Sequence, residues 1–134
     1  MIMRKMLILI TVMVLAGANF ACEKNSEGYR VGDAFVSSGI ADKEPVGISE
    51  HFFSDVEKIY CFSEFFDAGE PAEIRHRWIY NGQTVSEVPL EIKGPRWRTW
   101  SVKTIPPGSS GEWKIEIVSG SGKVLKEVTF NIGE

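Results

Sequence analysis

Four arginines spaced two residues apart are the side chains of this sequence best suited to holding a ligand. Arg75 and Arg77 form one pair, and Arg96 and Arg98 form the other. Alternate side chains of a β-strand point to one face, so each pair presents two guanidinium groups together. We expect all four on one sheet face, where they could bind a carboxylate, phosphate or sulfate bidentately. The alternative is a solvated face on which the arginines pair with glutamates of neighbouring strands. The candidate glutamates are Glu87, Glu91 and Glu112.

Two tryptophans accompany the second arginine pair. Trp97 and Trp100 lie three residues apart, so on a strand they point to opposite faces. One is then expected in the core, and the other at least partly exposed beside the arginines. An exposed indole could stack on a sugar ring or hold a peptide. Alternatively, the arginine planes cover the indole in a structural cation–π stack. The strand patterns place Trp78 and Trp113 in the core.

The sequence offers little for catalysis or metal binding. Ser101 and Cys61 have no nucleophile motif around them, and we find neither a paired-carboxylate pattern nor a glycine-rich phosphate loop. His76 shares a strand face with Trp78 and is expected to be a hydrogen-bonded core residue. His51 is far from it in sequence, and two histidines without a cysteine cluster make no zinc pattern. We therefore expect a non-catalytic protein that uses no metal and no cofactor.

Short alternating strands must position these side chains. Asn81-Gly82 suits the two positive-φ positions of a type I′ turn, so the strand after it should return antiparallel. Pro89 cannot donate to a ladder, which predicts an edge or a bulge there. The expected strands are 34–40, 56–64, 74–80, 83–92, 97–105, 111–118 and 124–132. About seven strands with regular turn signals predict an all-β fold, a single antiparallel β-sandwich.

Cys61 and Trp78 invite comparison with immunoglobulin domains, which place a cysteine on one strand and a tryptophan on the next. The second cysteine of that pattern is missing, and Trp113, Ile115 and Ile117 occupy the strand that would carry it. We therefore expect a sandwich that is immunoglobulin-like in architecture and lacks the disulfide. Cys61 is then expected to be a small buried residue.

The N-terminus resembles an export signal. Arg4 and Lys5 precede the apolar run Leu7–Leu15, and small residues follow it. This run is too short to span a bilayer comfortably. We assign residues 1–21 to the signal, with an uncleaved membrane anchor as the alternative. The protein is then expected in the periplasm or elsewhere in the cell envelope.

Residues 22–32 are polar and are predicted to be a flexible linker to a β-sandwich domain at 33–134. Cys22 stands where the lipidated cysteine of a lipoprotein would stand. Asn19 and Phe20 differ from the residues expected before such a cysteine, so ordinary signal cleavage is the alternative. A diacyl anchor on Cys22 would attach the domain stably to a membrane.

Charge is distributed unevenly along the chain. Residues 23–73 hold 4 basic and 12 acidic side chains, whereas residues 74–134 hold 9 basic and 6 acidic ones. The formal net charge of the whole chain is −3, which argues against a general nucleic-acid binder. The basic excess near the tryptophans can still make a local patch for anions.

Three tryptophan motifs carry a family resemblance. They are residues 76–82 (HRWIYNG), 94–101 (GPRWRTWS) and 111–113 (GEW). Shorter fits are Ala34-Phe35, Asp42–Val46, Lys103 and the stretch from Gly111 to Phe130. From about Ala34 to Ile132 the chain resembles domain of unknown function 2914, which occurs in exported or multi-domain bacterial proteins. This family has no established activity, so the resemblance implies no catalytic residues.

Taken together, the sequence favours a cell-envelope binding module for an anionic glycan, peptide or protein. The residues expected to bind are Arg75, Arg77, Arg96, Trp97, Arg98 and Trp100. The alternative is a structural or protein–protein interaction module, such as a lipid-anchored subunit of an envelope assembly, which would use an exposed edge strand or apolar patch.

Overall fold

The computed structural model describes residues 27–133 of the chain. The export signal at 1–21, the lipidation candidate Cys22 and the first part of the linker lie outside these residues. Their assignments therefore stay predictions.

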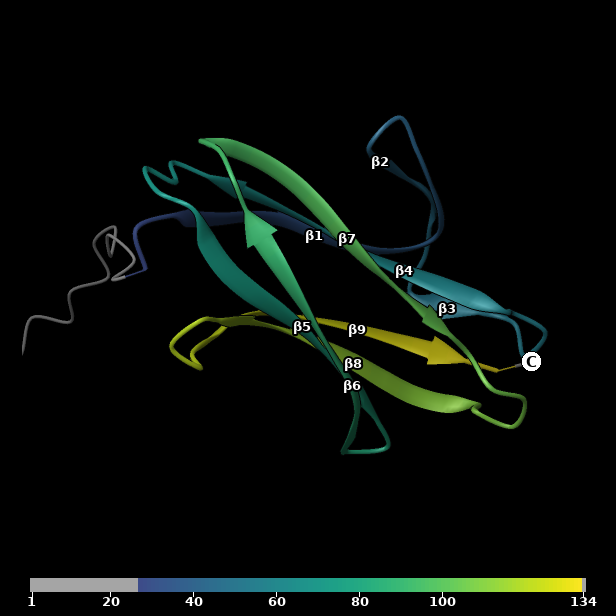
Figure 1. Ribbon diagram of the computed structural model, residues 1–134. Coiled ribbons are helices and arrows are strands. Elements are labelled where there is room, and N and C mark those ends of the chain that lie inside the picture. Colours follow the sequence, from purple (N-terminus) through teal and green to yellow (C-terminus); the bar gives the residue numbers. More distant parts are fainter. Residues whose placement is uncertain (1–26, 134) are drawn as a thin grey trace, which may run out of the picture.

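Nine strands form two sheets that pack face to face (Figure 1). The four-stranded sheet has the order β2 (Glu44–Ile48), β1 (Arg30–Ala41), β4 (Lys58–Phe66) and β7 (Arg96–Thr104). The five-stranded sheet has the order β3 (His51–Phe52), β9 (Val124–Ile132), β8 (Gly111–Ser119), β5 (Ala72–Tyr80) and β6 (Gln83–Ile92). All neighbours pair antiparallel except β3 and β9, which form a short parallel pair. The predicted all-β sandwich is confirmed.

The strand order is that of an immunoglobulin-like sandwich. In the four-stranded sheet, β1, β4 and β7 correspond to strands A, B and E of the immunoglobulin fold. In the five-stranded sheet, β9, β8, β5 and β6 correspond to its strands G, F, C and C′. All seven predicted strands are present. Asn81 and Gly82 both have positive φ, 47° and 80°, as the type I′ turn requires. Pro89 lies on β6, an edge strand, where its missing N–H is tolerated.

The domain begins earlier than predicted, so assigning all of residues 22–32 to a flexible linker is wrong. Strand β1 already starts at Arg30, and Tyr29 is only 4% exposed. Its ring meets Phe65 edge-to-face, with centroids 5.7 Å apart. The polar residues around Gly28 led to the linker prediction. A single buried aromatic side chain, that of Tyr29, is enough to attach the start of β1 to the core.

Aromatic and aliphatic side chains fill the space between the sheets. Trp78 and Trp113 are 0% and 2% exposed, and both pack against Phe130. Cys61 lies in the same core cluster as a free, buried thiol whose pKa is raised to about 12 by burial. The facing strand β8 offers Ile115 to this cluster and no cysteine. Apolar packing thus occupies the place of the immunoglobulin disulfide.

A buried polar bridge links the two sheets beside that core. His76 of β5 contacts Ser63 of β4 through Nε2 (2.9 Å) and Ser101 of β7 through Nδ1 (2.7 Å). Trp78 donates its indole N–H to Ser101 Oγ at 3.2 Å. A neutral imidazole supplies one donor and one acceptor, which suits two hydroxyl partners. Burial lowers the pKa of His76 to about 4, so the ring is neutral at physiological pH.

Candidate functional site

The two arginine pairs lie on opposite outer faces of the sandwich. On β5, His76 is buried between the sheets, so Arg75 and Arg77 point out of the five-stranded sheet. On β7, Ser101 points inward to His76, so Arg96 and Arg98 point out of the four-stranded sheet. The prediction that all four share one face is wrong. It failed because β5 and β7 belong to different sheets, which spacing within a strand does not reveal.

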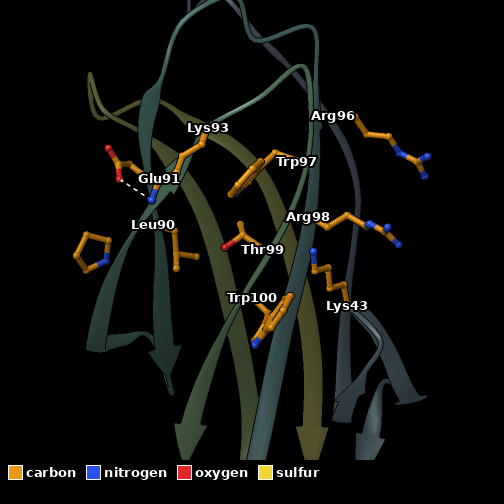
Figure 2. A pocket seen from close by; sticks show the side chains of 10 residues that line it. Lys43, Leu90, Glu91, Lys93, Arg96, Trp97, Arg98, Thr99 and Trp100 are labelled. Atoms are coloured by element: carbon orange, nitrogen blue, oxygen red, sulfur yellow. Dashed lines mark ion pairs between the residues drawn. The ribbon is translucent and has the colours of Figure 1, made fainter.

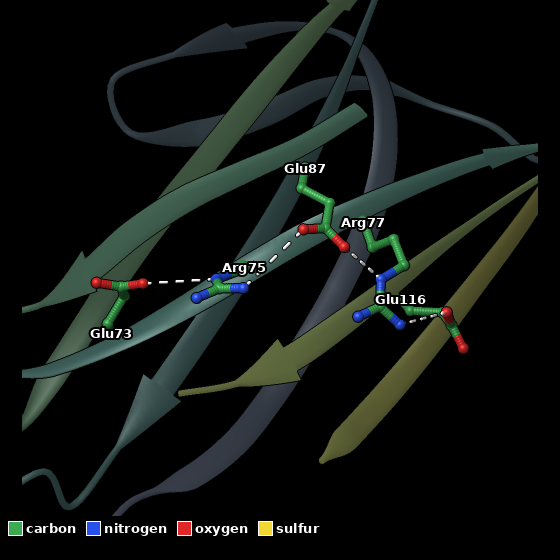
Figure 3. A network of polar contacts seen from close by, with 5 residues as sticks. All are labelled: Glu73, Arg75, Arg77, Glu87 and Glu116. Atoms are coloured by element: carbon green, nitrogen blue, oxygen red, sulfur yellow. Dashed lines mark hydrogen bonds and ion pairs between the residues drawn. The ribbon is translucent and has the colours of Figure 1, made fainter. Parts of the chain in front are cut away.

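The first pair is engaged in an ion-pair network with glutamates (Figure 3). Arg77 donates to Glu87 of β6 at 2.8 Å and to Glu116 of β8 at 3.3 Å. The hydrogen bond to Glu87 is the largest cause that raises the pKa of Arg77. Arg75 contacts Glu73 at 3.5 Å and Glu87 at 4.0 Å. For this pair the cross-strand alternative is correct, with Glu116 in place of the expected Glu91 or Glu112.

The second pair borders a cleft of about 650 Å³ between β6 and β7 (Figure 2). Both are edge strands, one of each sheet, and residues 93–95 cross between them. The sandwich is therefore open along this side. The lining residues are Lys43, Pro89, Leu90, Glu91, Lys93, Arg96, Trp97, Arg98, Thr99 and Trp100. Four of the six predicted binding residues meet here, and Arg75 and Arg77 do not.

The cleft follows the free edge of β7. Trp97 packs on the inner side against the core cluster that contains Phe65 and Ile92. Trp100 lies on the outer side, where its Cα partner on β4 is Phe62. The predicted opposite orientation of the two indoles is confirmed, and both are partly buried. Because side chains from both faces of β7 line one cleft, the cleft wraps around the strand edge.

The charge of the cleft is predominantly positive. Its lining holds Lys43, Lys93, Arg96 and Arg98 against a single carboxylate, Glu91. Figure 2 shows Arg96, Arg98 and Lys43 on one side of β7 and Trp97 and Leu90 on the other.

Glutamates outside the cleft partly balance these cations. Arg96 contacts Glu64 at 3.0 Å, and Arg98 contacts Glu44 at 3.2 Å. One partner of each pair is exposed, Arg96 at 67% and Glu44 at 69%, whereas Glu64 and Arg98 are only 14% and 30% exposed. Because one partner of each pair is partly shielded from solvent, a ligand carboxylate must compete with Glu64 for Arg96 and with Glu44 for Arg98.

Lys43 reaches the cleft from the tip of the β1–β2 hairpin. Asp42 and Lys43 form this tip with φ of 51° and 62°, in the left-handed region. Asp tolerates that conformation, but for a lysine it costs about 1–2 kcal/mol. Lys43 has no ion-pair partner among residues 27–133. Sequence reasoning missed Lys43 and Lys93, because neither the hairpin nor the crossing between sheets has a local signal at these residues.

Residues 27–133 contain neither a metal-binding cluster nor a membrane-spanning helix. This part of the chain holds no group of three or more His, Cys, Asp or Glu side chains that could bind a metal ion. It also has no helix with the length and apolarity needed to cross a membrane.

The second half of the chain matches a known protein family. Residues 71–132 fit the family described as protein of unknown function, DUF2914. This segment belongs to the DUF2914 family. No curated protein matches the chain. The DUF2914 segment runs from β5 to β9 and so supplies both walls of the cleft, whereas Lys43 comes from outside it. The resemblance expected for residues 34–70 lies outside the match and stays a prediction.

Proposed function

We propose that this DUF2914 protein is a non-catalytic binding module of the cell envelope, with an anionic ligand held in the cleft between β6 and β7. The observation that carries the proposal is the union of four cationic and two tryptophan side chains around one cavity of about 650 Å³. Ligand sites of this size combine apolar walls with a few polar groups that fix orientation.

Each kind of side chain has a role in this proposal. Arg96 and Arg98 recognise carboxylate or sulfate groups through two parallel N–H bonds, in competition with their ion pairs to Glu64 and Glu44. Trp97 and Trp100 supply large rigid surfaces for the rest of the ligand. Binding is therefore expected to weaken as salt rises, while retaining an apolar component that salt does not screen.

A charge-removal experiment with a matched control tests this proposal. The variant Arg96→Gln/Arg98→Gln removes two cations of the cleft, and Arg75→Gln/Arg77→Gln removes two from the opposite outer face. Poly-glutamate and heparin serve as anionic probes in calorimetric titrations. We expect the first variant to lose at least about tenfold in affinity and the second to stay within about twofold, because charged hydrogen bonds contribute about 1.5–3 kcal/mol each. Equal losses in both variants would indicate only an overall charge effect.

Tryptophan fluorescence provides a second reading of the same site. Trp78 and Trp113 are buried, so quenching by iodide reports mainly on Trp97 and Trp100. A ligand in the cleft should reduce that quenching. The variant Trp97→Phe/Trp100→Phe should abolish the change. Binding without any protection of these two indoles would place the ligand elsewhere.

The envelope location rests on residues 1–21 and Cys22. Labelled fatty acid that is incorporated into the protein, but not into a Cys22→Ser variant, would establish the lipid anchor. A protein that carries no label and accumulates in the periplasm would instead indicate export with ordinary signal cleavage.

A second candidate function is a structural module that binds a protein of an envelope assembly. The observation in its favour is apolar exposure on the four-stranded sheet. Ile48 and Val102 are 53% and 47% exposed and lie in one row across that sheet with Ser37 and Tyr60. Val102→Asp should then release a crosslinked envelope partner, whereas Arg96→Gln/Arg98→Gln should retain it.

A further inference from the structure

We infer that the ligand of the cleft is an acidic, extended segment of a partner protein that adds to β7 as a new edge strand. This inference rests on the proposed function and specifies its ligand class. In such complexes, main-chain hydrogen bonds provide the affinity, and the side chains that alternate along the strand provide specificity.

The strand β7 is the least protected edge of the described fold. Edge strands are usually protected by short length, proline, glycine or bulges. At the other edges, β3 has two residues and β2 has five, including Pro45 and a Gly47 with positive φ. The edge strand β6 contains Pro89 and shifts register against β5 at Trp78/Ile79. By contrast, β7 has nine residues without proline or glycine.

The pairing of β7 with β4 makes its other side a regular template. All nine residues pair in unbroken register, from Arg96 with Phe66 to Thr104 with Lys58. Alternate residues of such a strand direct their N–H and C=O groups away from the paired neighbour. Within residues 27–133, the backbone of residues 97–104 makes no hydrogen bond outside the β4 ladder. These groups are therefore available to a further strand.

Charge selects the partner for this edge. The strand contains Arg96, Arg98 and Lys103 and no acidic residue, so a second copy of β7 would meet like charge. A strand with carboxylates on its outer face would meet Arg98 and the hairpin-tip Lys43 instead. Its alternate side chains would face Trp97 and Thr99 inside the cleft, which favours apolar or small residues there. The strained φ of Lys43 fits this arrangement, because it places an unpaired cation beside the edge.

The test uses defined peptides. The probe is a nine-residue peptide of alternating glutamate and valine with blocked ends, equal in length to β7. Two further versions carry N-methyl groups on all glutamate amides or on all valine amides. Each methylation keeps the charge and removes the donors along one edge of the peptide strand. A lysine–valine peptide is the charge control, and poly-glutamate and heparin test for anion binding in general.

The expected result is loss of binding in only one of the two methylated peptides, by at least about tenfold, because several main-chain bonds disappear together. Alternate β7 amides should also gain protection from hydrogen exchange when the unmodified peptide binds. Equal binding of both methylated peptides, or no added protection in β7, refutes strand addition. If poly-glutamate or heparin still binds through Arg96 and Arg98, the proposed function survives that failure. If none of the anions binds, both proposals fail.

Discussion

Acid is expected to destabilise this fold through His76. The imidazole is 0% exposed, and both of its hydrogen-bond partners, Ser63 and Ser101, are neutral hydroxyls. Burial therefore holds its pKa at about 4, against 6.5 in an unfolded chain. Between these two values the unfolded state binds more protons than the folded state. The free energy of unfolding must then fall as the pH falls through that window.

The size of the effect follows from the two pKa values. In the window between them, stability changes by about 1.4 kcal/mol per pH unit. From pH 7 to pH 5 the loss amounts to about 2 kcal/mol, and it levels off below pH 4. This is a large fraction of the roughly 5–15 kcal/mol that stabilises a typical domain. Carboxylates add their own pH dependence, so the contribution of His76 must be taken as a difference between variants.

Urea unfolding at pH 7, 6 and 5 measures that difference. The variant His76→Gln keeps hydrogen-bonding groups in the core but cannot titrate in this range. We expect the stability difference between the native protein and this variant to shrink by about 2 kcal/mol from pH 7 to pH 5. The control His51→Gln removes an exposed histidine and leaves the Ser63–His76–Ser101 bridge intact.

The reasoning also has a test that does not depend on the variant folding. The His76 ring resonances of the native protein report its protonation directly by NMR. A midpoint near 6.5 in the folded state, or a pH dependence that His76→Gln leaves intact, would refute the assignment of a neutral buried bridge.

Three further expectations concern single residues. Ser101→Ala should lower stability by about 1–3 kcal/mol, because it leaves the Trp78 indole N–H and His76 Nδ1 buried without their partner, as urea unfolding would show. Cys61 should resist thiol reagents in the folded state and react on unfolding, because it is buried and its pKa is raised to about 12. Mass spectrometry of the Cys61 peptide measures the extent of labelling, and rapid labelling of the native protein would contradict the prediction. Lys43→Gly should raise the free energy of unfolding by about 0.5–1 kcal/mol, because glycine adopts the left-handed backbone without strain. The same variant should bind poly-glutamate more weakly, and an unchanged affinity would show that Lys43 is not part of the site.

Local patterns were sufficient to predict most of the fold. Alternation gave the seven long strands, and Asn81-Gly82 gave the β5–β6 hairpin. The two short strands β2 and β3 were missed. Strand β2 contains Pro45 and Gly47, which usually argue against a strand, and β3 pairs only two residues with β9. Tertiary contacts hold these strands in place, and a local pattern does not record such contacts.

The candidate site was only half predictable for a related reason. Spacing of two residues correctly placed each arginine pair on one face of its own strand. Only the strand order of the two sheets shows that β5 and β7 belong to different sheets. This arrangement places Arg75 and Arg77 away from the cleft. Lys43 was missed because it is 46 or more residues away in sequence from the other cleft residues. The fold brings it to the cleft, where its neighbour Glu44 contacts Arg98.

The buried bridge and the exposed edge meet on one strand, β7. Its inner face is fixed by Ser101, which contacts His76 and Trp78, and one edge is fixed by an unbroken ladder to β4. The strand is thus held from two directions while its remaining edge stays open. A rigid, preformed edge loses little conformational entropy when a further strand adds to it. The same polar bridge that makes the domain sensitive to acid therefore also helps to hold β7 in place as a template for a ligand.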